Sequence, residues 1–243
     1  MSSADIRGMF AGLPGAHGII EAALNGQGLV MTDDSARPSS AAVLAGDFLF
    51  FGGEPSEELV RRALNVENRA WIVQGSSAFL ALVQAQRSGT WSERIAFDPC
   101  RQPEDAHLTA LLANLPQGVT LVPIGAAEMA FCRKTPWAAD FVSQFTEDEY
   151  ARSGLGVLVC ADGAFVSGAS SYAAYPGGIE VEVDTAPAHR GHGYATLAAA
   201  KLILTAHQQG KIATWDAANE TSAHIAQKLG YRVTCAYQVF TTA

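Results

Sequence analysis

The sequence predicts an α/β (α+β) protein in which a mixed β-sheet is flanked by helices, with an N-terminal α/β module packed against it. Two observations carry this prediction. Short apolar stretches typical of strands alternate with amphipathic helical stretches along most of the 243 residues. In the second half, one segment joins a strand with alternating carboxylates, a glycine-punctuated turn and an alanine-rich helix, GIEVEVDTAPAHRGHGYATLAAAKLIL at 178–204.

The composition predicts an ordered chain with a substantial core. Apolar residues make up 49% and charged residues 16%, so disorder is not expected over most of the length. The net charge of −8 argues against a broad nucleic-acid-binding face, and no apolar run approaches the roughly 18 residues of a membrane span. The first residues lack the pattern of a secretory signal, so a cytoplasmic location is expected.

The cysteines and histidines do not suggest a metal site. Cys100, Cys132, Cys160 and Cys235 form no CxxC pair and lie among apolar or small neighbours, which predicts reduced thiols in the core. The six histidines lack ligand spacing, and no metal is expected.

The first half reads as alternating strands and helices after a glycine-rich beginning. The polar run at 32–40 is predicted to be a loop, and GDFLFFGGEP at 46–55 a strand. Ser56 is expected to cap the next helix, with Glu57 and Glu58 in its first turn. The remaining elements are predicted as strands at 70–74 and 93–99 and helices at 76–86 and 103–115.

Proline and glycine near 115–118 predict a domain boundary, which gives domains at 1–117 and 118–243. Helices are expected at 125–132 and 135–145, followed by a β-hairpin that turns at Asp162-Gly163. After the strand and helix of 178–204, the pattern predicts a strand at 211–217, a helix at 219–230 and a strand at 231–240.

The turn between strand and helix has the composition of a phosphate site. A helix N-terminus offers converging N–H groups and a positive dipole end, glycines at 191 and 193 keep side chains away, and Arg190 adds charge. A Rossmann dinucleotide site would share these features. However, Thr196 occupies its third glycine position, and six residues (185–190) separate the strand from Gly191 where a Rossmann turn is tight.

VDTAPAHRGHGYAT is similar to motif A of the GNAT acetyltransferases, with its Arg/Gln-x-x-Gly-x-Gly/Ala pattern. Asn219-x-x-Ser222 followed by Lys228-Leu-Gly-Tyr231 resembles the second motif of that superfamily. The resemblance covers about residues 119–243. The stretches GDFLFFGGEP, SGASSY, IEVEVDT and TWDAAN also resemble a bacterial GNAT branch with an additional N-terminal half, which would be a degenerate GNAT-like half or a substrate-side lid.

The resemblance implies acetyl-CoA as cosubstrate. The backbone of Val183 and Thr185 would pair with the pantetheine arm as an added strand. Asn219 would bind the pantetheine or thioester end, and Ser222 would lie near the arm or stabilise the helix start. The pyrophosphate would be held by the turn residues Arg190, Gly191, His192, Gly193, Tyr194 and Ala195.

The carboxylates of the strand before the turn are the candidate catalytic bases. Glu180, Glu182 and Asp184 share one face of a regular strand, either as a solvated face or as the lining of a cleft. Glu182 is the first choice for base and Glu180 the second, an order that a β-bulge in this strand would reverse. Asp216 would either contact the substrate ammonium or cap the helix that starts at Asn219.

The general acid is not identified by the motifs. Many GNAT enzymes carry tyrosine two residues before the motif lysine, and this chain has Ala226 there. The alternatives Tyr172, Tyr175, Tyr194 and Tyr231 are not distinguished by spacing. The resemblance implies an N-acetyltransferase that acts on a small-molecule amine. It is also compatible with a homodimer. The alternative is an acyl-CoA-binding sensor or structural module with lost or weak catalysis.

Overall fold

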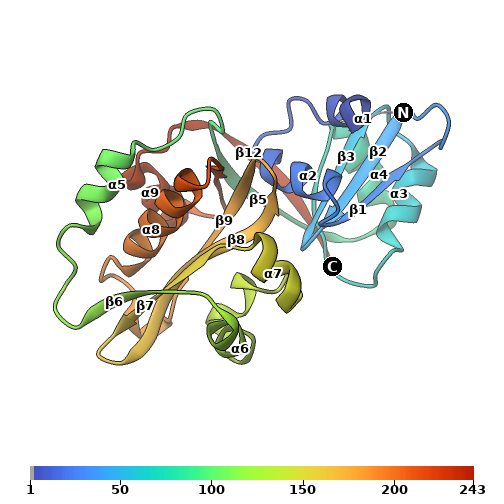
Figure 1. Ribbon diagram of the computed structural model, residues 1–243. Coiled ribbons are helices and arrows are strands. Elements are labelled where there is room, and N and C mark those ends of the chain that lie inside the picture. The colour runs from blue at the N-terminus through green and yellow to red at the C-terminus, as the bar shows by residue number, and fades with distance from the viewer. Residues whose placement is uncertain (1–2) are drawn as a thin grey trace. The chain divides into compact units, whose positions relative to one another are not determined.

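The computed structural model describes residues 3–243 and separates them into two compact units. The first unit runs to Ala96 and also includes Cys235–Ala243, and the second is Phe97–Thr234. The compact units therefore divide at Ala96 and again after Thr234, whereas the sequence analysis places one boundary at 117/118. The end of the chain returns to strands formed by its beginning (Figure 1).

The first unit is built on a sheet with the strand order β1-β2-β3-β4-β12-β5. Strand β3 is antiparallel to β2 and parallel to β4, and β12 is antiparallel to β4. The elements are α1 (Ser3–Met9), α2 (His17–Leu24), β1 (Leu29–Thr32), β2 (Ser40–Ala45), β3 (Phe48–Gly53), α3 (Glu57–Leu64), β4 (Ile72–Gln74), α4 (Ser77–Gln86), β5 (Gly89–Phe97) and, from the other end of the chain, β12 (Val233–Thr242).

Local signals predicted some of these elements well. The hydroxyl oxygen of Ser56 accepts a hydrogen bond from the amide of Leu59 at 3.2 Å, which confirms the predicted cap of α3. In contrast, α1, α2, β1 and β2 were not predicted. Strand β2 is buried at every position, so its sequence SAAVLA lacks the alternation that marks a half-exposed strand.

The core of the first unit joins residues that lie far apart in the sequence. The rings of Phe51 on β3 and Phe79 on α4 stack with their centroids 5.0 Å apart. Phe240 on β12 belongs to the same buried cluster, with 3% of its surface exposed, and packs edge-on against Trp91. The last strand therefore contributes to this core.

Phe240→Ala is expected to lower the free energy of unfolding by about 3–5 kcal/mol, because it leaves a cavity in this core. The matched control is Val233→Ala at the other end of the same strand, where the residue is 39% exposed and a small change is expected. Urea unfolding followed by circular dichroism measures both variants. Equal, small losses would contradict the packing of β12 in the first unit.

The second unit contains a mixed sheet with the order β10-β9-β8-β7-β6, in which only the β9–β10 pair is parallel. This confirms the predicted mixed sheet. Its elements are α5 (Asp105–Leu112), β6 (Val119–Pro123), α6 (Ala126–Lys134), the 3₁₀ helix η1 (Pro136–Phe141), α7 (Glu147–Ser153), β7 (Gly156–Ala161), β8 (Ala164–Tyr175), β9 (Gly178–Thr185), the 3₁₀ helix η2 (Pro187–His189), α8 (Tyr194–Gln208), β10 (Ile212–Thr214), β11 (Asp216–Ala217) and α9 (Glu220–Leu229).

The predicted hairpin is confirmed, and two predicted elements have different forms. Asp162 and Gly163 have φ values of 49° and 84°, the backbone that a two-residue hairpin turn of this type requires. The helix expected at 135–145 is the short 3₁₀ helix η1, and α7 follows it unpredicted. The strand expected at 211–217 is interrupted at Trp215, so that β10 and β11 belong to different sheets.

The cysteines differ in burial. Cys132 is buried, and burial raises the pKa of its thiol to about 11, as expected for a core thiol. Cys100 and Cys235 are exposed, so the predicted core position is wrong for these two. Apolar sequence neighbours did not indicate burial at either position.

Helices cover both faces of the second unit's sheet. Helices α8 and α9 lie on one side and α6 and α7 on the other (Figure 1). The alanines of α8 let it approach β7, β8 and β9 closely, because Ala198, Ala199 and Ala200 are fully buried. On the other face, the Ser170 hydroxyl of β8 donates to the carbonyl oxygen of Phe141 in η1 at 2.7 Å.

Candidate functional site

Strands β9 and β10 are paired over only part of their length. The last register pair is Glu180 with Thr214, where β10 ends, whereas β9 continues to Thr185 and stays paired with β8 up to Ser167. One edge of β9 is therefore not covered by β10 from residue 181 onward. An extended ligand can add to such an edge as a strand does.

The backbone of Val183 and Thr185 faces this edge. The amide of Ala186 donates to the carbonyl of Val166 at 2.8 Å, and hydrogen-bonding residues alternate along an antiparallel pair. Residues 184 and 182 therefore point their backbone groups toward β8, and residues 183 and 185 point theirs away. At Thr185 the amide donates to Asp184 and the carbonyl accepts from Arg190, so a ligand would exchange with these contacts.

The turn after β9 leads into an uncapped helix N-terminus. Gly191 and Gly193 have φ values of 82° and 80°, and Gly193 is the N-cap residue of α8. No side-chain hydrogen bond caps this helix, and its first turn holds no acidic residue. The first amide donating along the helix is that of Leu197, to the carbonyl of Gly193, so the preceding amides point outward. These amides and the helix dipole favour an anion.

Arg190 and His192 differ in their orientation. The Arg190 guanidinium lies 3.4 Å from the Asp184 carboxylate, and its side chain is 63% exposed, so it can exchange this partner for an anion. The exposed His192 ring stacks on Tyr194 at 5.5 Å, and its Nδ1 lies 3.0 Å from the carbonyl oxygen of Arg190. The His192 side chain thus contacts the backbone of the turn and the ring of Tyr194, and it is not among the residues that line the neighbouring pocket.

A pocket of about 480 Å³ lies between the end of β9, this turn and α9. It brings together all of the residues predicted to contact the coenzyme except His192. These lining residues are Val183, Thr185, Arg190, Gly191, Gly193, Tyr194, Ala195, Asn219 and Ser222.

Sequence reasoning missed several residues of the same pocket. Thr221, His224, Ile225 and Lys228 line it from α9. Their spacing places them on one helix face with Ser222, so helical periodicity from the second motif could have identified them. Lys228 and His224 add cationic or potentially cationic groups to a site that already contains Arg190.

The start of α9 is held by the two polar residues of the second motif. The Asn219 side-chain oxygen accepts from the amide of Ser222 at 2.9 Å, and the Ser222 hydroxyl accepts from Trp215 Nε1 at 3.1 Å. Asn219 is the N-cap, so the interpretation of Asp216 as the cap of this helix is wrong. Asp216 lies half-buried in β11, and its contact with a substrate stays a prediction.

The three carboxylates of β9 differ in exposure. Glu180 is 4% exposed, and Glu182 and Asp184 are half-buried, so a simply solvated strand face is wrong for Glu180. Glu182 is paired with Ser170 and therefore lies on the face covered by η1. The register shift lies in β8, between Ser171 and Ala173. The side chains along β9 therefore keep their regular alternation between the two faces of the sheet.

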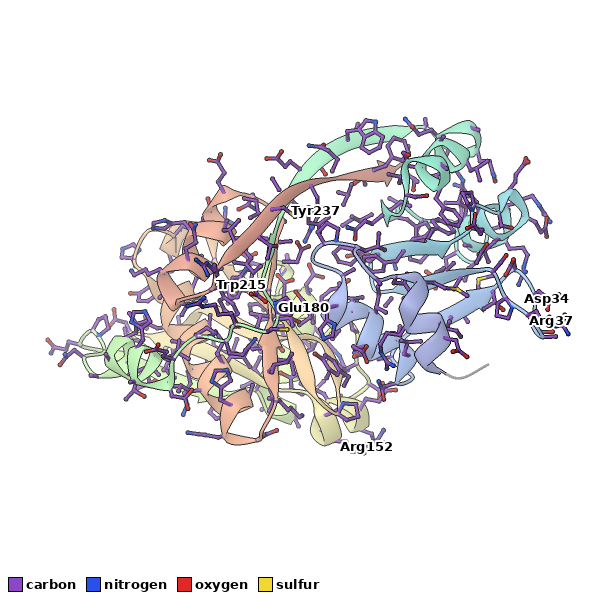
Figure 2. The ribbon with its side chains drawn as sticks, turned by 90° about the horizontal axis from the view of Figure 1, so that it is seen from above. Asp34, Arg37, Arg152, Glu180, Trp215 and Tyr237 are labelled. Atoms are coloured by element: carbon purple, nitrogen blue, oxygen red, sulfur yellow. The ribbon has the colours of Figure 1, made fainter. Side chains whose placement is uncertain are left out.

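Buried groups surround Glu180. Glu180 and Trp215, which Figure 2 labels, are both buried. The Tyr231 hydroxyl donates to the carbonyl oxygen of Ala213 at 2.6 Å. Burial, and secondarily the neighbouring Glu180 carboxyl, raise the pKa of Tyr231 well above its ordinary value. Tyr231 therefore stays protonated and acts in the structure as a hydrogen-bond donor to the backbone.

The remaining positions considered for the general acid are spread over the unit. Ala226 is fully buried in α9, and Tyr172 is 7% exposed on β8. Tyr194 lines the pocket, at the phosphate turn. Among residues 3–243, no group of three His, Cys, Asp or Glu side chains is placed to hold a metal, and no helix is long and apolar enough to cross a membrane.

Known proteins resemble this chain over nearly its whole length. The family model described as GNAT acetyltransferase matches residues 9–240. A solved GCN5-related N-acetyltransferase-like protein from Streptococcus suis 89/1591 is 32% identical, with a TM-score of 0.88 over 99% of this chain and 98% of that one. No curated protein sequence matched the chain.

Two further solved structures share the fold at lower identity. A GCN5-related N-acetyltransferase from Kribbella flavida is 21% identical, with a TM-score of 0.56 over 83% of this chain and 86% of that one. A tandem GNAT protein from the clavulanic acid biosynthesis pathway is 14% identical, with a TM-score of 0.56 over 100% and 96% of the two chains.

Proposed function

Because the chain belongs to the GNAT acetyltransferase family, we propose that it transfers an acetyl group from acetyl-CoA to the amine of a small molecule. The observation that carries the proposal is the pocket at the N-terminus of α8, which adjoins the part of β9 that β10 does not cover. An anion-binding turn beside an open strand edge suits a ligand with a pyrophosphate and an amide-containing arm.

The residues of the pocket are proposed to divide the coenzyme between them. The amides from Arg190 to Ala195 would hold the pyrophosphate, with the Arg190 side chain as a second positive group. The backbone of Val183 and Thr185 would pair with the pantetheine arm. Asn219 and Ser222 would contact the arm from the start of α9, in addition to their capping contacts.

The transfer needs the amine as its free base. A lysine-like amine with a pKa near 10.4 is only about 0.04% unprotonated at pH 7. Glu182 is proposed as the base that removes the proton, directly or through water, because it is half-buried on the same strand that would bind the pantetheine. Asp216 is proposed to attract the substrate ammonium. The amine then attacks the thioester carbonyl and the C–N bond forms. The C–S bond breaks, coenzyme A leaves as its thiolate, and the nitrogen gives its second proton to water.

A separate proposal concerns the N-terminal half and keeps the boundary predicted from the sequence, although the compact units divide at Ala96 and after Thr234. We propose that residues 1–117 form a degenerate GNAT-like half and that 118–243 form the acetyltransferase domain. The likeness of the whole chain to a tandem GNAT protein supports this division. The proposed setting is the cytoplasm, where acetyl-CoA and small amines meet, and the proposed protein partner is a second copy of the chain.

A turnover assay with a panel of small amines tests the function. Thiol release from acetyl-CoA that depends on the amine is expected, with the acetylated amine identified by mass spectrometry. Tight coenzyme binding without amine-dependent thiol release across a broad panel would favour an acyl-CoA sensor instead. Absence of coenzyme binding would contradict both.

A further inference from the structure

The hydroxyl group of Thr214 lies between two hydrogen-bond acceptors. Its oxygen is 3.0 Å from the carbonyl oxygen of Ile179, and it also contacts Oε2 of Glu180. A hydroxyl has one hydrogen to donate, and a backbone carbonyl can only accept. Both contacts are full hydrogen bonds only if Glu180 carries a proton, donates it to Thr214 Oγ1, and Thr214 donates in turn to Ile179.

The surroundings of Glu180 favour the protonated form. The residue is 4% exposed, and burial disfavours the charged carboxylate. Glu182 lies two residues along the same face, at about 6.6 Å for a regular strand, and a like charge there disfavours a second one. From the segment after α9, Tyr231 presents a neutral phenol whose hydrogen is given to Ala213. Two carboxyl groups in unequal environments can therefore hold different protonation states.

Glu180 also lies at the place where the reacting thioester is expected. It forms with Thr214 the last pair before β10 ends, and the open edge of β9 begins at the next residue. A ligand whose pyrophosphate is at the turn and whose arm pairs with residues 185 and 183 runs along β9 toward Glu180. Position 180 on β9 is thus at the far end of the arm from the pyrophosphate, just beyond the residues that line the pocket.

We propose that Glu180, held as a carboxylic acid by Thr214, donates the proton that the leaving thiolate takes up. The inference rests on the proposed acetyl transfer and replaces the role of second-choice base for this residue. As the C–S bond breaks, Glu180 gives its proton to sulfur and becomes a carboxylate. Glu182 then holds the first proton, taken from the substrate ammonium, and the nitrogen gives its second proton to water as the amide forms. Transfer of the first proton from Glu182 to Glu180, directly or through water, restores both groups. This step would supply the general acid in a chain that has Ala226 at the position where many GNAT enzymes carry tyrosine.

The protonation state is tested without turnover, by infrared spectroscopy of protein labelled with ¹³C-carboxyl glutamate. At pH 7 we expect a carboxylic-acid C=O band that disappears in Glu180→Gln, shifts in Thr214→Val, and persists in the control Glu182→Gln. Glu180→Gln exchanges one neutral group for another of similar shape, so urea unfolding at pH 7 is expected to change little. A wild-type spectrum without this band, or a band that survives in Glu180→Gln, overturns the proposal.

The donor role is tested by steady-state kinetics with the acceptor found in the amine panel. Glu180→Gln is expected to lower kcat by about 10²–10⁴-fold and to remove the loss of rate at high pH, with coenzyme affinity unchanged. If Glu180→Gln keeps the wild-type kcat while the wild-type protein shows the carboxylic-acid band, Glu180 is protonated but does not act as the proton donor. A wild-type protein that binds coenzyme but acetylates no amine overturns the proposed function, and the spectra still report whether Glu180 is protonated.

Discussion

Gly193→Val is expected to lower coenzyme affinity by at least about tenfold, the effect of 1.4 kcal/mol on a dissociation constant. Gly193 has φ 80° and ψ 4°, a left-handed backbone that costs an L-residue about 1–2 kcal/mol and a β-branched residue more. A Cβ at this position would meet no protein atom within 4 Å, so it would project into space that the proposed phosphate group needs. Isothermal titration with coenzyme A measures the loss.

Gly210→Val is the matched control for this strain. Gly210 follows the C-terminal end of the same helix, has φ 69°, and likewise has no atom within 4 Å of an added Cβ. Valine there strains the backbone in the same way but lies outside the pocket. Coenzyme affinity is expected to fall in Gly193→Val and to stay near wild type in Gly210→Val. Unchanged affinity in the first variant would remove the phosphate site from this turn.

Glu182→Gln is expected to lower kcat by about 10²–10⁴-fold, because the amide cannot accept the proton of the substrate ammonium. Coenzyme affinity should stay near normal, since the proposed coenzyme contacts of β9 use the backbone of Val183 and Thr185. The rise of kcat with pH should flatten at neutral pH and return at high pH, where the amine loses its proton without help. A pH–rate profile with the identified amine measures this.

Glu104→Gln is the control for the loss of one carboxylate. Glu104 is exposed at the start of α5 and makes no capping hydrogen bond with its side chain. This variant should keep both kcat and the pH profile of the parent. Full activity in Glu182→Gln would exclude Glu182 as the base and would leave the acid assigned to Glu180 without its partner.

The features that could be predicted from the sequence are those made by neighbours in the chain. The cap of α3 was predicted at Ser56, whose side chain accepts a hydrogen bond from the amide three residues later. Asn219 caps α9 in the same way, whereas the sequence analysis offered Asp216 for that cap. The hairpin at Asp162-Gly163 and the glycines before α8 follow from backbone conformations that few other residues adopt. The spacing of the two motifs was sufficient to indicate the family, which the family model and the Streptococcus suis structure then confirmed.

Prediction failed where the environment of a residue is made by distant parts of the chain. Strand β2 went unpredicted because both of its faces are covered, and Cys100 and Cys235 looked like core thiols but are exposed. The interruption of the strand after Thr214 was also invisible in the local pattern. This interruption ends the pairing of β10 with β9 beside Glu180.

The sequence by itself determined the glycine turn before α8, the helix that follows it, and the alternation of carboxylates on the preceding strand. These depend on backbone preferences and on side-chain periodicity within a few residues. Only the tertiary structure decided how the carboxylates differ: Glu180 is buried against Thr214, whereas Glu182 remains half-buried. Strand pairing brings Thr214 to Glu180 across 34 residues, and the protonation of a carboxyl group depends on the solvent and the partners around it.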